Sequence, residues 1–132
     1  MDTLAGPTTI LVIEDESDLR DAACEFLGAA GFVAIPAQNG VDALNLLRRR
    51  GRPSVILLDL TMPVMNGYEF LRFLRKDQVL QSVPVVVTSA IDDLPEGARY
   101  LLRKPYEVRS LVDVLARCCL EQVDQGLASA AM

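Results

Sequence analysis

The sequence predicts an α/β fold in which a doubly wound, open parallel sheet of five strands carries helices on both faces. Short, continuous apolar runs alternate five times with segments of helical periodicity, and polar residues follow the runs where strands would end. Continuous apolar runs of this length are typical of strands buried on both faces, as in parallel sheets. Alternation of strand and helix indicates right-handed βαβ units, which place helices on both sides of such a sheet.

The first strand is predicted over residues 10–13, and a helix follows it. Ser17 is placed to cap this helix and Gly31 to end it. A second strand is predicted over residues 32–35. The apolar residues that recur at helical spacing, and that we expect on the inner face of the helix, are Leu19, Ala22, Ala23, Phe26, Leu27 and Ala30.

A second helix is predicted to begin at Asn39, whose side chain suits an N-cap. The arginines at 48–50, followed by Gly51, are typical of a helix C-terminus because cations there interact favourably with the helix dipole. The third strand is predicted over residues 54–58 and ends at Asp59. The residues of the second helix that we expect to face the core are Ala43, Leu44 and Leu47.

A loop over residues 60–65 separates the third strand from the third helix. Asn66 and Glu69 have the spacing of a capping box at the start of this helix. The fourth strand is predicted over residues 83–87 and a short fifth strand over residues 100–102. The side chains that the third helix is expected to bury are Phe70, Leu71 and Leu74.

The segment between the fourth and fifth strands is short. Residues 90–98 leave nine positions, and Pro95 interrupts them. The fourth helix of the alternating pattern is therefore predicted to be shortened or missing. The last helix begins near Glu107, and the residues expected on its inner face are Val108, Leu111, Leu115 and either Cys118 or Cys119.

Length and composition indicate one globular domain. The chain has 132 residues, of which 51% are hydrophobic and 23% charged, which excludes disordered and collagen-like classes. Its apolar runs are far shorter than the roughly 18 residues that a membrane-spanning helix needs. Residues 1–7 lack the basic and apolar regions of a signal peptide. We therefore expect a cytoplasmic protein without membrane contact.

The absence of histidine narrows the possible chemistry. It excludes Ser-His-Asp triads, HExxH metal sites and a phosphohistidine carried by this chain. The three cysteines contain no CxxC motif, which argues against a disulfide framework or a zinc site. The net charge of −5 and the pI near 4.6 argue against nucleic acid as a partner.

Polar residues stand at the carboxyl ends of four predicted strands. Ligands of open parallel sheets bind at this edge. If the first strand lies between the second and the third, three carboxylates come close together and need a cation to remain ionised. Mg²⁺ suits such a site because it takes carboxylates and also binds phosphate oxygens. The residues concerned are Glu14, Asp15, Asp59, Thr88, Ser89 and Lys104.

Asp59 is the candidate nucleophile because it stands alone at the end of its strand. Carboxylates form covalent intermediates in phosphoryl transfer. The charge that develops on the phosphoryl oxygens needs cations and hydrogen-bond donors, which a metal ion, Lys104 and Thr88 could supply. The sequence thus predicts an aspartate that accepts a phosphoryl group.

The chain resembles the receiver domains of two-component response regulators. Four segments in order, residues 11–16, 57–67, 87–90 and 104–106, carry the resemblance, which covers residues 9–121. It implies a flavodoxin-like sheet with strand order 2-1-3-4-5. Residues 1–8 would be an N-terminal extension and 122–132 a C-terminal tail without an output domain.

The resemblance also implies the roles of individual residues. Asp59 would be phosphorylated by a histidine kinase or a histidine phosphotransfer protein. Mg²⁺ would be held by Glu14, Asp15, Asp59 and the main-chain carbonyl of Thr61. The phosphoryl group would be contacted by Thr88, Ser89 and Lys104, and the peptide bond from Lys104 to Pro105 would be cis. Such a domain is not an enzyme acting on a separate substrate, since it catalyses at most its own phosphorylation and dephosphorylation.

Two positions depart from the pattern of the family. Glu14 replaces the commoner aspartate, and Leu101 stands where the family usually has an aromatic residue that switches between exposed and buried positions. Tyr100 is one place away and is expected to point to the opposite face of its strand. With the fourth helix also reduced, the face through which many receivers dimerise is diminished, so we expect a monomer.

Two other functions remain open from the residues. One is an aspartate-nucleophile phosphatase of the haloacid dehalogenase type, although that type needs a second aspartate where Thr61 stands. The other is a pseudo-receiver that binds partners without phosphorylation.

Overall fold

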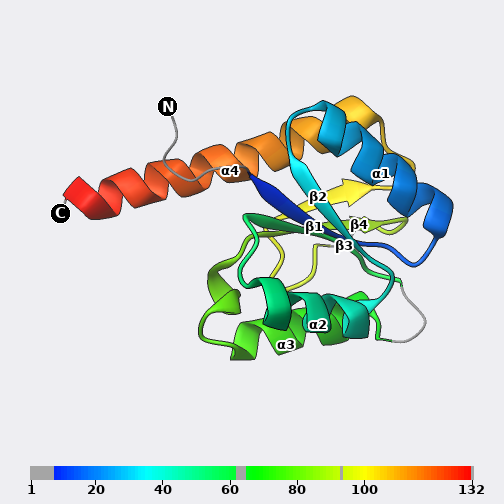
Figure 1. The fold of residues 1–132 in the computed structure, drawn as a ribbon, viewed down its shortest axis with the longest axis horizontal. Helices are drawn as coiled ribbons and strands as arrows, with labels where there is room; N and C mark the ends of the chain where they lie inside the picture. Colours follow the sequence, from blue (N-terminus) through cyan, green and yellow to red (C-terminus); the bar gives the residue numbers. More distant parts are fainter. Residues whose placement is uncertain (1–7, 62–64, 93, 132) are drawn as a thin grey trace.

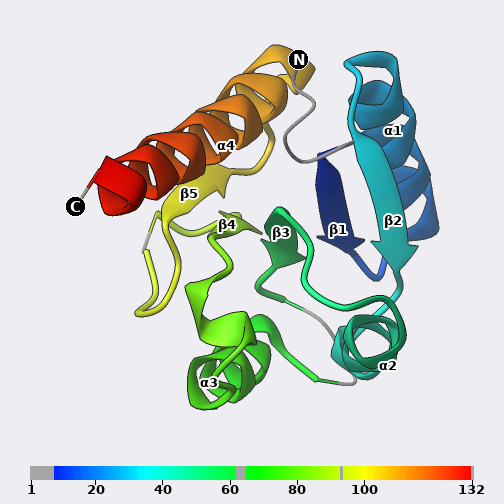
Figure 2. The same ribbon diagram turned by 60° about the vertical axis from the view of Figure 1, so that its left-hand side comes forward.

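Five parallel strands form one sheet in the order β2-β1-β3-β4-β5, as the sequence predicts (Figure 1 and Figure 2). The computed structural model describes the backbone of residues 8–61, 65–92 and 94–131, and the side chains of those up to Gln122. The predicted positions of Met62, Pro63 and Val64 in a loop lie outside the described residues. The strands are β1 (Thr9–Ile13), β2 (Val33–Ala37), β3 (Val55–Asp59), β4 (Val85–Ser89) and β5 (Tyr100–Arg103).

Helices cover both faces of the sheet (Figure 2). α1 (Ser17–Ala29) and α4 (Val108–Ala131) lie on one face, and α2 (Gly40–Arg50) and α3 (Gly67–Lys76) lie on the other. A short 3-10 helix, η1 (Leu80–Ser82), leads into β4. None of the described helices combines the length and the apolar character that spanning a membrane requires.

Alternation along the strands divides the core into two layers. In each strand, every second side chain packs against α2 and α3, and the side chains between them pack against α1 and α4. This follows because successive strand residues point to opposite faces of the sheet. The first layer takes Leu11, Ile13, Ile56, Leu58, Val85 and Val87 from the strands. The second takes Ile10, Val12, Val55, Leu57 and Val86. Burial on both faces explains why these strands read as continuous apolar runs.

No helix is present between β4 and β5 in the described part of this segment, as predicted. The connection instead turns at Gly97, whose φ of 97° favours glycine. It is attached to α3 by an ion pair of 3.0 Å between Arg75 Nη1 and Glu96 Oε1. This end of the sheet therefore has a loop where the other crossovers have a helix.

Side-chain caps place the starts of α2 and α3 as predicted. Asn39 Oδ1 accepts a hydrogen bond of 2.8 Å from the backbone N–H of Asp42. Asn66 and Glu69 form a reciprocal capping box. These bonds satisfy backbone donors that the first helical turn leaves without intrahelical partners.

The structure corrects two details of the helix that follows β1. Ser17 is the first residue of α1 rather than its cap, and Glu16 at the cap position makes no side-chain cap hydrogen bond. Only Ala23 and Leu27 of the expected inner face are buried. The other four expected residues, Leu19, Ala22, Phe26 and Ala30, are exposed. Helical spacing alone does not reveal how wide a stripe of the helix its neighbours cover.

The last helix is longer than expected. Leu111, Leu115 and Cys118 are buried as predicted, but the backbone stays helical to Ala131. Residues 122–131, predicted as a tail, therefore continue α4, which runs past the sheet in Figure 1. Gln122 anchors this part of the helix through a 2.7 Å hydrogen bond from its Nε2 to the carbonyl of Ser54.

Candidate functional site

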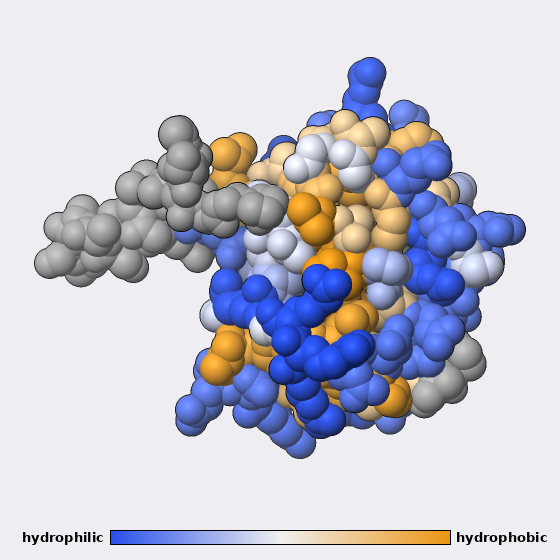
Figure 3. All heavy atoms as spheres, in the orientation of Figure 1, coloured by the Kyte–Doolittle hydropathy of each residue, from blue (hydrophilic) through white to orange (hydrophobic). Residues whose placement is uncertain are grey.

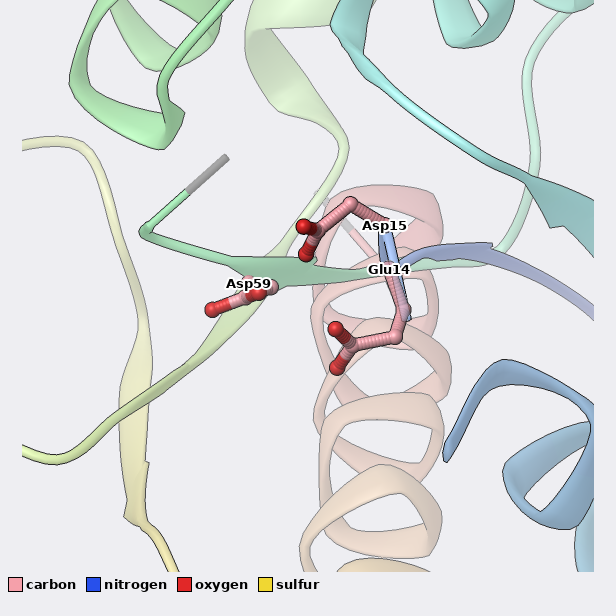
Figure 4. A group of neighbouring side chains, drawn as sticks. All are labelled: Glu14, Asp15 and Asp59. Atoms are coloured by element: carbon pink, nitrogen blue, oxygen red, sulfur yellow. The ribbon is translucent and has the colours of Figure 1, made fainter. Parts of the chain in front are cut away.

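Three carboxylates meet at the carboxyl edge of the sheet. Ile13 lies opposite Leu58 in the pairing of β1 with β3, which brings the next residues, Glu14 and Asp59, side by side. An oxygen from each of Glu14, Asp15 and Asp59 lies within 4.8 Å of the others. Figure 4 shows the three carboxylates around a common space. Glu14 and Asp59 are buried, and Asp15 is exposed.

Lys104 joins the cluster from the end of β5, an edge strand of the sheet. Ser89 pairs with Arg103 between β4 and β5, and the Lys104 N–H donates to the carbonyl of Ser89 at 2.8 Å. The Lys104 ammonium lies 3.1 Å from Glu14 Oε1 and 3.6 Å from Asp59 Oδ1. The peptide bond to Pro105 is cis, as the resemblance implies. Strand pairing thus brings together a lysine and a glutamate that are 90 positions apart.

Burial and the neighbouring charges change the acidity of these groups. Burial raises the pKa of Asp59 from 3.8 to about 7, and the Glu14 carboxylate acts in the same direction, against Lys104 and the N–H of Thr61. Burial alone would lower the pKa of Lys104, but the charges of Asp59 and Glu14 hold it above its usual value. In the absence of a further cation, the Asp59 carboxyl is therefore partly protonated near neutral pH, because its pKa is raised to about 7.

The carboxylate cluster fits a hard divalent cation. Its donors are oxygens only, two of them on buried residues and one on an exposed residue that leaves the site open to solvent. Mg²⁺ prefers oxygen ligands and usually retains several waters. A cation here would also remove the repulsion that raises the pKa of Asp59.

The remaining predicted site residues differ in their relation to Asp59. Thr88 pairs directly with Asp59 in the sheet and is buried. The Thr61 N–H donates to Asp59 Oδ1 at 3.2 Å; the metal contact through its carbonyl stays a prediction. The Ser89 hydroxyl accepts a 3.1 Å hydrogen bond from the N–H of Ile91. The predicted contact of Ser89 with a phosphoryl group stays a prediction.

The chain after Asp59 folds back tightly on the start of α3. The Gly67 N–H donates to the carbonyl of Leu60 at 2.9 Å. A Cβ at Gly67 would lie 2.6 Å from Leu60 Cα and 3.0 Å from the carbonyl oxygen of Asp59. A hydrogen atom is therefore the only side chain that this approach accommodates. The sequence indicated a helix cap at Asn66 but not this contact.

Tyr106 is a neighbour of the site that the sequence reasoning did not single out. It lines, with Glu14 and Thr88, a small hollow of about 10 Å³. Burial raises the pKa of its hydroxyl, with Glu14 and Asp59 acting in the same direction and Lys104 opposing them. Its position directly after the Lys104–Pro105 pair is the signal that could have identified it.

The sequence profile of the response regulator receiver domain matches residues 10–116. The chain belongs to this family. The matched range contains every residue of the cluster. It also contains the four segments, residues 11–16, 57–67, 87–90 and 104–106, that carry the resemblance to receiver domains.

Relatives of this receiver domain include transcriptional regulatory proteins. The chain is 37% identical over 130 residues to the alkaline phosphatase synthesis transcriptional regulatory protein SphR of Synechococcus elongatus, covering 86% of this chain and 49% of the relative. It is 32% identical over 110 residues to the phosphate regulon transcriptional regulatory protein PhoB of Escherichia coli, covering 78% and 48%. The receiver domain thus spans about half the length of these relatives.

A solved structure with the same fold is the chemotaxis protein CheY4 of Vibrio cholerae. It has a TM-score of 0.78 and 27% identity, covering 86% of this chain and 99% of the solved one. The likeness agrees with the strand order and with the parallel pairing observed here.

The receiver domain lacks an aromatic residue at the position where the family often has a switch. Leu101 packs against the core layer of α2 and α3, whereas Tyr100 packs against the layer of α1 and α4. This is the opposite orientation that strand alternation predicts. The Tyr100 hydroxyl donates a 2.6 Å hydrogen bond to Glu121 Oε2, which ties the ring to α4.

Proposed function

We propose that this receiver domain accepts a phosphoryl group on Asp59 from a phosphohistidine of a histidine kinase or phosphotransfer protein, in the cytoplasm and in a Mg²⁺-dependent reaction. The observation that carries the proposal is the position of Asp59: a buried carboxylate at a strand end, with a lysine ammonium 3.6 Å away and two further carboxylates beside it. The family match supports it, since the motifs of receiver domains surround this residue.

In this reaction an Asp59 carboxylate oxygen attacks the phosphorus of the donor. The new O–P bond forms as the N–P bond of the phosphoimidazole breaks, and the donor nitrogen keeps the electron pair. We expect Lys104 and the hydroxyl of Thr88 to bind phosphoryl oxygens as negative charge develops on them. Mg²⁺, held by Glu14, Asp15 and Asp59, would neutralise the crowded carboxylates and stabilise the charge of the phosphoryl group.

Phosphorylation by acetyl phosphate tests the proposal. With Mg²⁺, the wild-type chain should gain one phosphoryl group in intact-mass spectra, and Asp59→Asn should gain none because it lacks the nucleophile. Asp113→Asn, which changes an exposed carboxylate on α4, is the matched control and should react as the wild type does. Equal mass shifts in wild type and Asp59→Asn would contradict the assignment. An unmodified wild type would favour the pseudo-receiver function.

The acidic pair should govern the response to metal. In wild type, Mg²⁺ at ten times its Kd should stabilise the fold by about 1.4 kcal/mol, which raises the melting temperature by about 5 °C for a domain of this size. Glu14→Gln combined with Asp15→Asn should abolish that rise, because two of the three carboxylates lose their charge.

The same double variant should melt no lower than the wild type without metal, since it relieves the repulsion among the three carboxylates. Thermal melts in chelator and in Mg²⁺ measure both effects. A preserved rise with Mg²⁺ would show that the cation binds elsewhere.

An apolar groove beside Lys104 supports a protein donor. Its volume is about 450 Å³, and exposed Leu19 and Phe26 of α1 form one wall while Pro105 and Tyr106 form the other. A donor whose phosphohistidine reaches Asp59 passes over this groove, because Lys104 belongs to both. We therefore propose that the exposed side chains of Leu19 and Phe26 contact the donor protein.

The haloacid dehalogenase alternative is set aside because the chain belongs to the receiver family. Thr61 occupies the position where that alternative needs a second aspartate. Receiver domains are signalling domains, so turnover of a separate substrate is not part of this function.

Phosphorylation is expected to leave the protein monomeric and to order the 89–97 segment around Thr88. A stable dimer buries about 1,200 Å² or more, and a loop presents little regular surface where a helix is missing. Ile91 is 66% and Leu94 51% exposed in this segment, so an order change there would expose or hide a partner site. Light scattering with beryllofluoride and Mg²⁺ should give the monomer mass. A dimer that substitutions in residues 108–120 disrupt would refute this expectation.

A further inference from the structure

A basic surface lies at the end of the molecule remote from Asp59. Arg48, Arg49 and Arg50 form the last turn of α2, and Arg52 follows Gly51; all four arginines are exposed. Because α2 connects the carboxyl end of β2 to the start of β3, its C-terminus lies at the opposite edge of the sheet from the carboxylate cluster. The proposed phosphoryl transfer uses none of these residues.

The surface is hollowed next to the arginines. A groove of about 290 Å³ runs between the end of α2 and the α3–η1 segment. Arg48 and Arg52 line one side of it, and Phe73 and Val79 line the other. Phe73 is 40% and Val79 63% exposed. We call these residues, with Leu44 at the floor, the α2–α3 groove.

A second hollow of about 150 Å³ continues the surface on the other side of Gly51, where Arg50 and Arg52 meet Val33 of β2. Figure 3 shows strongly hydrophilic atoms gathered over the part of the molecule that holds α2 and α3, with hydrophobic atoms beside them. Cationic and apolar groups therefore alternate over this end of the molecule.

The arginines have few partners within the chain. The ion pairs found among the described residues involve other cations. Arg52 Nη2 donates a 3.1 Å hydrogen bond to Ser82 Oγ, which links the segment after α2 to η1. Arg72 and Lys76 on α3 are also exposed, so the surface is positive although the whole chain carries a net charge of −5.

The helix dipole explains only part of this arrangement. It favours cations in the last turn of α2, but Arg52 follows the helix, and the dipole has no bearing on the exposure of Phe73 and Val79. Exposed apolar side chains bordered by charged ones are typical of interaction sites.

We propose that the α2–α3 groove docks an acidic protein segment, which inserts an apolar side chain between Phe73 and Val79 and places carboxylates against Arg48 and Arg52. Guanidinium groups bind carboxylates through paired, charge-assisted hydrogen bonds. Charge complementarity identifies the occupant, because the surface is cationic at its rim and apolar at its floor. The segment would dock independently of the phosphoryl donor, whose groove lies beside Lys104.

A nucleic acid fits the groove less well. Asp77 places a carboxylate in the lining, and it repels phosphates and peptide carboxylates alike, so it does not distinguish the two partners. Its Oδ1 accepts hydrogen bonds of 2.9 and 3.0 Å from the N–H groups of Val79 and Leu80 and is fixed in place. The apolar floor offers a phosphate backbone nothing, whereas it can bury a leucine or phenylalanine side chain of a peptide.

Binding of a labelled peptide to the full chain tests the proposal. The probe is a 15-residue peptide with leucine at helical spacing and glutamate on its other face, followed by fluorescence anisotropy at about 150 mM salt, where weak surface attraction is screened. Arg48→Gln with Arg52→Gln should weaken binding by about tenfold or more, since both carboxylate contacts are lost. Phe73→Ser should weaken it by a similar factor through the lost apolar contact.

Arg103→Gln with Arg109→Gln removes the same charge from exposed positions on β5 and α4, and this matched control should bind within about twofold of wild type. Phosphorylation by acetyl phosphate should be unchanged in every variant, which separates this surface from the site at Asp59.

Three results would overturn the proposal. In the first, the matched control binds the peptide as weakly as the Arg48 and Arg52 variant does. In the second, the wild-type chain binds a scrambled peptide of the same composition equally well. In the third, the wild-type chain does not bind the peptide even at millimolar concentration. Displacement of the peptide by duplex DNA or by anionic vesicles, in a manner that depends on Arg48 and Arg52, would assign the surface to those partners instead.

Discussion

Asp59→Asn should stabilise the metal-free protein at pH 8 and have little effect on its stability at pH 5. The folded state raises the pKa of Asp59 from 3.8 to about 7. Between these values the folded chain binds a proton that the unfolded chain releases, so the free energy of unfolding falls as the pH rises through this window. Above it the full cost of the buried charge remains, up to about 4 kcal/mol for a shift of about three pKa units.

Thermal melts in chelator at pH 5 and pH 8 measure this effect. The melting temperature of wild type should fall between these pH values by more than that of Asp59→Asn, and Mg²⁺ should reduce the difference by supplying the missing positive charge. Asp113→Asn, on the exposed face of α4, should follow the wild-type profile. Parallel profiles for wild type and Asp59→Asn would show that the carboxyl at position 59 has an ordinary pKa in the fold.

Gly67→Ala should destabilise the fold by about 2–3 kcal/mol, the cost typical of overpacking. Helix propensity taken alone predicts the opposite sign, because alanine is favoured over glycine in a helix by about 1 kcal/mol. The added methyl would lie 2.6 Å from Leu60 Cα and 3.0 Å from the carbonyl oxygen of Asp59. Both neighbours are backbone atoms beside the nucleophile, so relief requires moving the chain that carries Asp59.

Gly28→Ala is the matched control, because a Cβ at this position of α1 meets nothing within 4 Å. It should stabilise the protein by about 0.5–1 kcal/mol. Chemical denaturation measures both variants, and the rate of phosphorylation by acetyl phosphate should fall in Gly67→Ala alone. A Gly67→Ala protein as stable as wild type would show that the start of α3 can shift without cost.

Most of the fold follows from patterns that are local in the chain. The strands are found within one or two residues of their predicted bounds. Each apolar run covers the buried part of its strand, and polar residues begin near the point where the strand ends. Asn39 and Asn66 cap helices as predicted, since a cap depends only on residues within one turn. The described residues between β4 and β5 form no helix, which follows from nine available positions and Pro95.

The sequence predicted which residues gather at the candidate site. Glu14, Asp15, Asp59 and Lys104 stand at strand ends, and parallel strands bring their ends to one edge. The sequence does not say which of these groups touch. The pairing of Lys104 with Glu14 as well as Asp59, and the burial that shifts the pKa of Asp59, depend on the order of the strands and on the layers above them.

The sequence by itself therefore determined the order of strands and helices along the chain and the residue types at the edge of the sheet, because periodicity, caps and strand ends are properties of neighbouring residues. Only the tertiary structure decided which apolar side chains remain exposed. Leu19 and Phe26 repeat at helical spacing as buried residues do, yet they face the groove beside Lys104. Burial depends on where α4 and the turn after β5 pack against α1, and that is a contact between segments distant in the chain.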